Sequence, residues 1–197
     1  MPTVVVPFRG TEGKSRLARL PSELRAAVRE AMLADVVAAC EAVGAVYLVT
    51  SATYRHASAI TVADDGRGQG AAVAAGLDAA ARAGAPGPFL VVNADLPCVT
   101  ARDVLALAGA VPDGGLALVA AADGTTNALA LSSADRFEPL YGPGSAARFA
   151  AVAPSRVVDV PNLIDDVDTI DDLERLRDRV GTHTRSVLAR LQAGAAA

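Results

Sequence analysis

The chain has 197 residues, of which 52% are hydrophobic and 20% are charged, and its formal net charge is −4. This length and apolar content suit one domain with a sizeable core and exclude an intrinsically disordered chain. The acidic balance gives no general basic surface for nucleic acid. No apolar run reaches the roughly 18 residues of a membrane helix. The opening residues MPTVVVPFRG are not typical of a secretory signal. We therefore expect a soluble cytoplasmic protein that binds neither nucleic acid nor membranes.

Short apolar runs alternate with alanine-rich helical stretches along the chain. In chain order we expect a strand at 4–8, a helix at 22–43, strands at 45–50 and 60–63, a helix at 71–83, a strand at 89–92, a helix at 101–110, strands at 116–121 and 128–131, a helix at 145–152, a strand at 157–160, a helix at 170–180, and a weaker helix from 183 into a frayed tail. This alternation predicts a single α/β domain over 1–197 with a mostly parallel sheet flanked by helices. The two strands between 116 and 131 have no helix between them, which predicts one antiparallel strand.

The loop at residues 9–16, RGTEGKSR, directly follows the first expected strand. Ligands of open α/β sheets bind beyond the carboxyl ends of the strands, so this loop is a candidate site. Its glycines, backbone N–H groups and cations suit a polyphosphate, although a solvated turn would have a similar composition. The candidate nucleotide-binding residues are Arg9, Gly10, Lys14, Ser15 and Arg16, and the candidate catalytic cations are Lys14 and Arg16.

The Gly-Lys-Ser sequence in this loop does not make a P-loop. A P-loop needs a glycine where Phe8 stands, and it opens a long helix at its Lys-Ser, which Pro21 would interrupt. Lys14 is nevertheless notable as the one lysine among 18 basic residues. A compact ammonium can be hard to replace by a planar guanidinium, which favours a specific role for Lys14 over a generic positive charge.

Two acidic segments are candidates for a metal site. Asp95 follows a buried apolar strand, where an unpaired carboxylate is costly, and Thr100 already suits the cap of the next helix. Asp166 and Asp168 are two residues apart, so they face the same side of an extended segment. Carboxylates at this edge of a sheet suit Mg²⁺ held against a nucleotide phosphate. The alternatives are that Asp95 caps a helix and that the second segment is plain acidic surface.

Three further loops are rich in glycine and small polar residues. Residues 124–127, GTTN, and 141–145, YGPGS, have many free N–H groups and suit an anion, although each could be a plain turn. Residues 66–70, GRGQG, open a helix, and Gly68 and Gly70 could approach a phosphate or a base. Their spacing excludes the dinucleotide-binding fingerprint.

Five segments, taken in order, resemble one family: KSRL at 14–17, NADLP at 93–97, TNAL at 126–129, YGPGSAA at 141–147 and DVDT at 166–169. The family comprises the 2-phospho-L-lactate guanylyltransferases and the related phosphoenolpyruvate guanylyltransferases of coenzyme F(420) biosynthesis. The resemblance covers residues 3–180. This chain departs from the family at Pro7-Phe8-Arg9, where Pro-Val-Lys is usual, and at Gly68-Gln69-Gly70, where Gly-Leu-Asn is usual.

The resemblance implies a Rossmann-like nucleotidyltransferase fold of the GT-A-like kind, with GTP as donor and Mg²⁺ as cofactor. It implies a small phosphorylated carboxylic acid as acceptor, with phosphoenolpyruvate favoured and 2-phospho-L-lactate as the alternative. The implied metal ligands are Asp95, Asp166 and Asp168. The implied acceptor-binding residues are Thr126 or Asn127, Gly142 and Ser145, and the family pattern does not decide between Thr126 and Asn127.

Two other functions stay open. A different nucleotidyltransferase, such as a molybdopterin guanylyltransferase, would share the fold but would have a glycine-rich first loop followed by Pro-Lys. A non-catalytic GTP-binding regulator would bind GTP without turnover and would tolerate loss of the acidic residues, all three of which are present here. A homodimer is compatible with the sequence, which does not show which helix faces are exposed.

Overall fold

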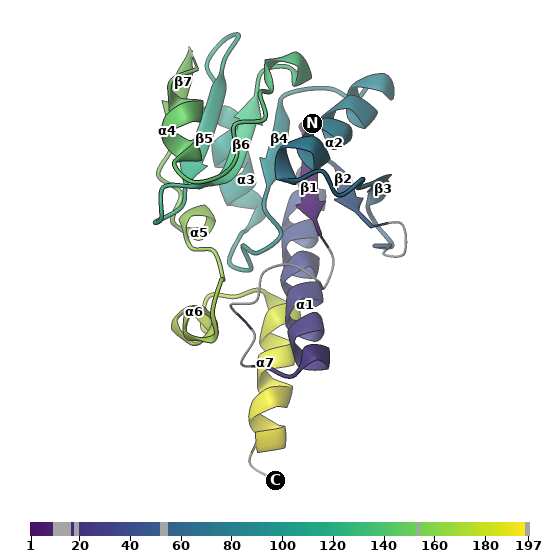
Figure 1. Ribbon diagram of the computed structural model, residues 1–197, viewed down its shortest axis with the longest axis vertical. Coiled ribbons are helices and arrows are strands. Elements are labelled where there is room, and N and C mark those ends of the chain that lie inside the picture. The colour runs from purple at the N-terminus through teal and green to yellow at the C-terminus, as the bar shows by residue number, and fades with distance from the viewer. Residues whose placement is uncertain (10–16, 18–19, 52–54, 153, 196–197) are drawn as a thin grey trace.

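The structure, a computed structural model, describes residues 1–9, 17, 20–51, 55–152 and 154–195. Its elements, shown in Figure 1, are β1 (Thr3–Phe8), α1 (Ser22–Glu41), β2 (Ala45–Thr50), β3 (Ile60–Ala63), α2 (Gln69–Arg82), β4 (Phe89–Val92), α3 (Ala101–Gly109), β5 (Leu116–Ala120), β6 (Thr126–Leu131), the 3₁₀ turn η3 (Ala134–Arg136), α4 (Ser145–Ala150), β7 (Ser155–Val157), α5 (Pro161–Ile164), α6 (Ile170–Leu176) and α7 (Thr182–Ala195). None of the helices in these ranges is both long and apolar enough to span a bilayer.

The strands form one seven-stranded sheet in the order β3-β2-β1-β4-β6-β5-β7. Strands β3, β2, β1 and β4 run parallel to one another, and β7 is parallel to β5. Strand β6 runs antiparallel to both β4 and β5, which confirms the expected antiparallel element. Because β6 is reversed, its first residue, Thr126, lies at the edge where β4 ends. This reversal brings two loops that are far apart in sequence to the same place.

Both faces of the sheet are covered, as the alternation of side chains along β1 shows. Val4 and Val6 pack in a core cluster with α1 and α3, whereas Val5 packs in a second cluster with α2 and α4. Opposite faces of a strand carry successive side chains, so a continuous apolar strand requires helices on both sides. The α/β layers predicted from the chain are therefore confirmed.

A third core joins the N-terminal half of α1 to α6 and α7, of which α7 lies beside α1 in Figure 1. The junction is polar as well as apolar, because the buried carboxylate of Asp35 on α1 accepts hydrogen bonds from the backbone N–H groups of His183 and Thr184, each at 2.9 Å. Gly181 lies directly against Asp35, where a side chain would clash. Its N–H donates to the carbonyl of Pro97 at 2.8 Å. The start of α7 is thus fastened both to α1 and to the loop that follows β4.

Several element boundaries differ from those expected. The last strand is Ser155–Val157 and not 157–160, since Pro161 begins the unexpected short helix α5 immediately afterwards. Helix α6 ends at Leu176 and not at residue 180, and η3 was not expected. The predicted cap at Thr100 is confirmed: Thr100 forms a reciprocal capping box with the aspartate three residues later, and Thr169 does the same at the start of α6.

Candidate active site

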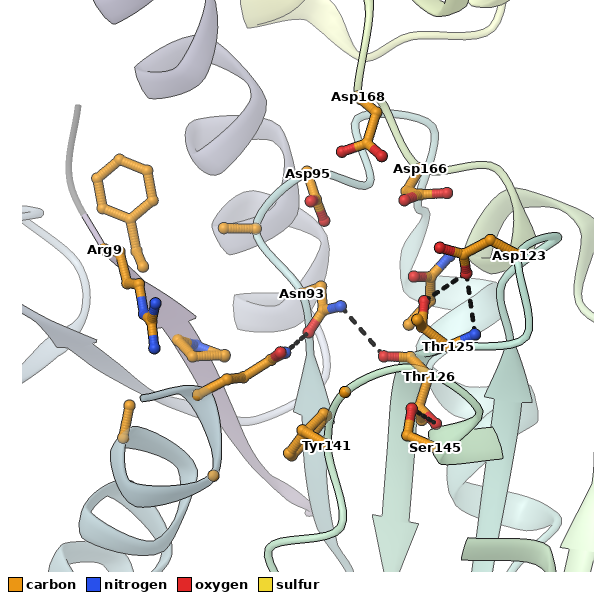
Figure 2. Close-up of a pocket in the computed structure, with 18 of the residues that line it drawn as sticks. Arg9, Asn93, Asp95, Asp123, Thr125, Thr126, Tyr141, Ser145, Asp166 and Asp168 are labelled. Carbon is orange, nitrogen blue, oxygen red and sulfur yellow. Dashed lines mark hydrogen bonds between the residues drawn. The ribbon is translucent and has the colours of Figure 1, made fainter. Parts of the chain in front are cut away.

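A cleft of about 800 Å³ lies along the edge of the sheet where β1 and β4 end and β6 begins. The start of α2, the loop before α4 and the segment between α5 and α6 complete its walls. Figure 2 shows Arg9 on one side and Asp166 and Asp168 across the cleft from it, with Tyr141 and Ser145 at the end nearer α4. The site therefore lies where ligands of open α/β sheets bind.

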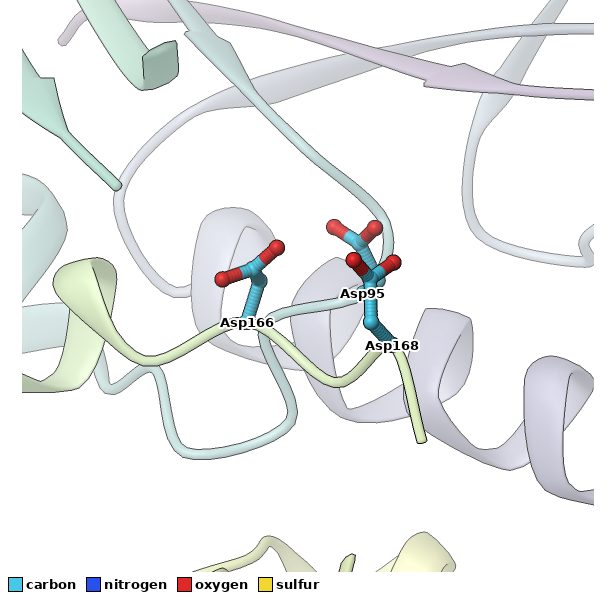
Figure 3. A group of neighbouring side chains, drawn as sticks. All are labelled: Asp95, Asp166 and Asp168. Atoms are coloured by element: carbon cyan, nitrogen blue, oxygen red, sulfur yellow. The ribbon is translucent and has the colours of Figure 1, made fainter. Parts of the chain in front are cut away.

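The three predicted metal ligands meet in this cleft. Ligand oxygens of Asp95, Asp166 and Asp168 all lie within 4.8 Å of one another, and Figure 3 shows the three carboxylates gathered together. The backbone also joins the two segments, since the N–H of Val167 donates to the carbonyl of Asp95 at 3.0 Å. Two acidic loops that are about 70 residues apart in the chain thus form one cluster.

The charges of this cluster are unfavourable without a counter-ion. Burial raises the pKa of the Asp95 carboxyl to about 7, and the Asp166 carboxylate adds to the rise. Burial and the neighbouring Asp168 likewise raise the pKa of Asp166. The Oδ1 atom of Asp95 is buried and has no hydrogen-bond partner among the residues that the structure describes. An all-oxygen donor set with an unpartnered buried oxygen fits a hard divalent cation.

The neighbouring carboxylate, Asp165, is engaged elsewhere. Arg175 and Arg179 bind its two oxygens at 2.8 and 2.7 Å, and Arg179 also donates to Asn162 at 2.9 Å. These contacts anchor the acidic segment from outside, so that Asp166 and Asp168 face the cleft while Asp165 points away from the cluster into an ion pair.

Thr126 and Asn127 are both buried, but their side chains have different partners. The hydroxyl of Thr126 lies 3.0 Å from that of Ser145, which is also buried. The amide of Asn127 donates to the carbonyl of Ile164 at 3.0 Å, and a hydrogen bond from the same side chain opposes the rise in the pKa of Asp166. Thr126 therefore faces the loop before α4, whereas Asn127 supports the acidic segment.

A pair of amides that the sequence did not single out crosses the floor of the cleft. The Nε2 of Gln69 donates to Asn93 Oδ1 at 2.8 Å, and Asn93 Nδ2 donates to the carbonyl of Thr126 at 3.2 Å (Figure 2). These two hydrogen bonds connect the start of α2, the end of β4 and the start of β6. Gln69 stands in the Gly68-Gln69-Gly70 stretch that departs from the family, so that departure was the one available signal.

The described cations lie towards the β1 side of the cleft. Arg9 extends across the start of α2, and its guanidinium would be 3.3 Å from a Cβ atom at Gly68. Gly70 packs against Pro139 and also lines the cleft. Arg29 of α1, which the sequence analysis missed because it sits within a helix, lines the cleft and lies 5.8 Å from the Phe8 ring centroid. Burial lowers its pKa, and Asp95 partly offsets this effect.

The remaining predicted residues of the first loop are Gly10, Lys14, Ser15 and Arg16, and all four lie outside the described residues. Gly142 and Ser145, the other predicted acceptor-binding residues, both line the cleft. The structure therefore gathers Arg9, Gly70, Thr126, Asn127, Gly142, Ser145 and the acidic triad around one space, with Gly68 beside Arg9.

Comparison with known proteins agrees with this geometry. A model of the MobA-like NTP transferase domain matches residues 15–193. A phosphoenolpyruvate guanylyltransferase from Sphaerobacter thermophilus is 40% identical over 188 residues, which cover 87% of this chain and 90% of that protein. The chain belongs to this guanylyltransferase family.

Other members of the guanylyltransferase family are named for different acceptor acids. A 2-phospho-L-lactate guanylyltransferase from Methanosphaerula palustris is 32% identical and covers 87% of this chain and 82% of its own. A 3-phospho-D-glycerate guanylyltransferase from Phenylobacterium zucineum is 33% identical, with coverage of 98% and 97%. Membership of the family therefore does not by itself identify the acceptor acid of this protein.

Solved structures share the fold. A protein from Desulfovibrio desulfuricans superposes with a TM-score of 0.71 at 16% identity and covers 98% of this chain and 95% of its own. Rv0371c of Mycobacterium tuberculosis, solved in complex with manganese, superposes with a TM-score of 0.56 at 22% identity, with coverage of 91% and 98%. These structures confirm the nucleotidyltransferase fold that the resemblance implied.

Proposed function

We propose that the protein transfers GMP from GTP to phosphoenolpyruvate, with release of pyrophosphate, as a Mg²⁺-dependent step of coenzyme F(420) biosynthesis. The observation that carries the proposal is the clustering of Asp95, Asp166 and Asp168 in a cleft that also contains the buried Thr126–Ser145 pair, in a member of a guanylyltransferase family. A cytoplasmic location and a homodimer remain predictions from the sequence.

The reaction needs charge stabilisation more than proton transfer. The acceptor's phosphate oxygen attacks the α-phosphorus of GTP and is already an anion, so no strong general base is required. The obstacle is the repulsion between two anions and the charge that develops on the pyrophosphate. Mg²⁺ held by the three carboxylates would neutralise part of this charge. The described residues that line the cleft include no histidine, which is consistent with such chemistry.

Lysine and arginine side chains of the protein are expected to neutralise the rest of the negative charge on the phosphates. We assign Lys14 and Arg16 to the GTP phosphates on the basis of the loop sequence and the family resemblance. Arg9, which faces the cleft from the end of β1, extends this positive region towards the start of α2. Arg29 stands near Asp95 and is placed to balance the acidic cluster from the α1 side. The donor is thus expected on the β1 side of the cleft, with its phosphates directed towards the triad.

The acceptor is expected at the other end, beside α4. Of the two candidates left open by the sequence, Thr126 is the better acceptor ligand, because its hydroxyl adjoins Ser145. Asn127 instead supports the segment that carries Asp166. Phosphoenolpyruvate is favoured over other phospho-acids because the relative that is 40% identical is named for it.

A direct test is to incubate the protein with GTP, Mg²⁺ and one of three acids, namely phosphoenolpyruvate, 2-phospho-L-lactate and 3-phospho-D-glycerate, and to measure pyrophosphate. We expect release that depends on the acid and is fastest with phosphoenolpyruvate. ATP in place of GTP serves as the nucleotide control. Faster release with another acid would overturn the acceptor assignment, and GTP binding without pyrophosphate release from any acid would favour the non-catalytic regulator.

A further inference from the structure

The loop before α4 is held by a single arginine, Arg148. Its guanidinium donates to the carbonyl of Leu140 from Nε at 3.2 Å and from Nη2 at 2.8 Å, to that of Pro143 at 2.7 Å, and to that of Tyr141 at 3.3 Å. Three carbonyls of a four-residue stretch therefore point towards one side chain. Arg148 is exposed and does not line the cleft, whereas Tyr141, Gly142 and Pro143 do.

This arrangement determines where the neighbouring N–H groups point. In a trans peptide the C=O of one residue and the N–H of the next point in opposite directions, and these peptides are trans. With the carbonyls of Leu140, Tyr141 and Pro143 turned to Arg148, the N–H groups of Tyr141, Gly142 and Gly144 point the other way. Among the described residues, those three N–H groups have no acceptor. Consecutive N–H groups on one side of a turn form an anion-binding concavity.

The backbone conformation of the loop depends on the same contact. Gly142 and Gly144 have φ values of +113° and +70°, which residues with a side chain rarely adopt. A Cβ atom at either position would lie within 3.7 Å of the Arg148 guanidinium, so the loop lies directly on it. The Thr126–Ser145 hydroxyl pair adjoins the loop at its α4 end.

We propose that Arg148 is a positioning residue for the acceptor: it holds the 140–144 loop so that the N–H groups of Tyr141, Gly142 and Gly144 face the cleft and bind an anionic group of a phospho-carboxylate. The proposal rests on the proposed function for the identity of the acid. Arg148 itself does not touch the substrate. The planar fork of an arginine can serve three carbonyls at once, which a lysine ammonium on a flexible stem does not reproduce.

The test is equilibrium binding, measured by calorimetry with Mg²⁺ present, of phosphoenolpyruvate and, separately, of GTP. Arg148→Ala should raise the Kd of phosphoenolpyruvate roughly tenfold or more, because several N–H donors to an anion lose their alignment, and should leave the Kd of GTP unchanged. Arg148→Lys should restore only part of the affinity. Arg102→Ala, which removes an exposed arginine of α3 that does not line the cleft, is the matched control and should resemble the wild type.

Steady-state kinetics give a second readout, in which KM rises for phosphoenolpyruvate and not for GTP. The proposal is overturned if Arg148→Ala binds phosphoenolpyruvate as tightly as the wild type, if it weakens both ligands equally, or if the wild type binds no phosphoenolpyruvate. Binding of phosphoenolpyruvate that follows the expected pattern without any pyrophosphate release would support the role of Arg148 and would contradict the proposed function instead.

Discussion

Three carboxylates held this close are a source of instability unless a cation joins them. Asp95, Asp166 and Asp168 bring their oxygens within 4.8 Å of one another, and one buried oxygen of Asp95 has no hydrogen-bond partner in the described part of the chain. Burial raises the pKa values of Asp95 and Asp166, and the like charges of the neighbouring carboxylates raise them further. At the scale of single residues, the acidic triad could therefore hold a metal ion, and its charges do not favour the stability of the metal-free chain.

Asp95→Asn tests this interpretation. Removing one charge relieves repulsion, so the metal-free variant should unfold at the same temperature as the wild type or higher. The wild type should gain about 2.7 kcal/mol of stability when Mg²⁺ is present at 100 times its Kd, and the variant should lose this gain together with its turnover. Thermal unfolding with and without Mg²⁺ measures both, with the exposed Asp113→Asn as the control. If Asp95→Asn merely destabilises the metal-free protein, Asp95 is a structural residue.

Lys14 is the residue whose role rests most on sequence, because it lies outside the described residues. If its ammonium stabilises charge on the GTP phosphates, Lys14→Ala should lower kcat roughly a hundredfold or more without unfolding the protein. Lys14→Arg should stay well below the wild type, since a guanidinium does not reproduce a compact ammonium. Pyrophosphate release together with circular dichroism checks the prediction, and near-normal turnover in either variant would refute it.

At the residue scale, the sequence indicated residues that lie within a motif better than it indicated residues that interact only once the chain has folded. The acidic triad, Ser145 and the choice between Thr126 and Asn127 came from the sequence because each lies in a recognisable segment. The Gln69–Asn93 amide pair was not, because the two residues are 24 positions apart and neither of their segments indicates that the two side chains meet. Arg29 was missed for a similar reason: a charged residue within a helix shows its relevance only once the helix is docked beside Asp95.

At the scale of elements, the attachment of α7 depends on one buried carboxylate. Asp35 accepts the N–H groups of His183 and Thr184, two donors at the start of α7 that have no partner within the helix. Because Gly181 also donates to Pro97, this docking supports the loop that carries Asp95. Nothing in the sequence indicated the contact, since a cap supplied from about 150 residues away leaves no local signal.

Asp35→Asn should therefore destabilise the fold. The amide can turn only one oxygen towards the two N–H groups and leaves the other poorly satisfied, at a cost of about 1 to 3 kcal/mol. Denaturant unfolding measures this loss, and Asp178→Asn, an exposed change just before α7, is the matched control. An unchanged free energy of unfolding in Asp35→Asn would show that the apolar packing of α7 alone holds it in place.

Most elements followed from local patterns, and the exceptions have a common cause. Long amphipathic helices and buried strands were placed within a few residues of their true ends. Helix α5 and strand β7 have four and three residues, which is too short for any periodicity to be read. Strand β7 was misplaced because the valines at 157, 158 and 160 resemble a strand, whereas the strand ends at Val157 and only the N–H of Val158 still donates to β5, at Leu118, before Pro161 begins α5.

At the scale of the whole molecule, the site is a product of topology. The reversed direction of β6 brings Thr126 to the end of β4, where the N–H of Asn93 donates to the carbonyl of Asn127 at 3.1 Å. The segment after α5 then returns to the same edge and supplies Asp166 and Asp168. The family resemblance predicted which residues would meet, whereas composition and periodicity alone predicted only that strand ends would form the site.

The central claim is that this cleft joins GTP to a phospho-acid with loss of pyrophosphate. Phosphorus NMR of a mixture of GTP, phosphoenolpyruvate and Mg²⁺ tests it most directly, because it follows every phosphorus atom at once. The account predicts one pyrophosphate for each phosphoenolpyruvate consumed and a new pair of coupled diphosphate signals from the guanylylated acid. Formation of GDP and orthophosphate, or an unchanged spectrum with phosphoenolpyruvate, 2-phospho-L-lactate and 3-phospho-D-glycerate alike, would contradict it.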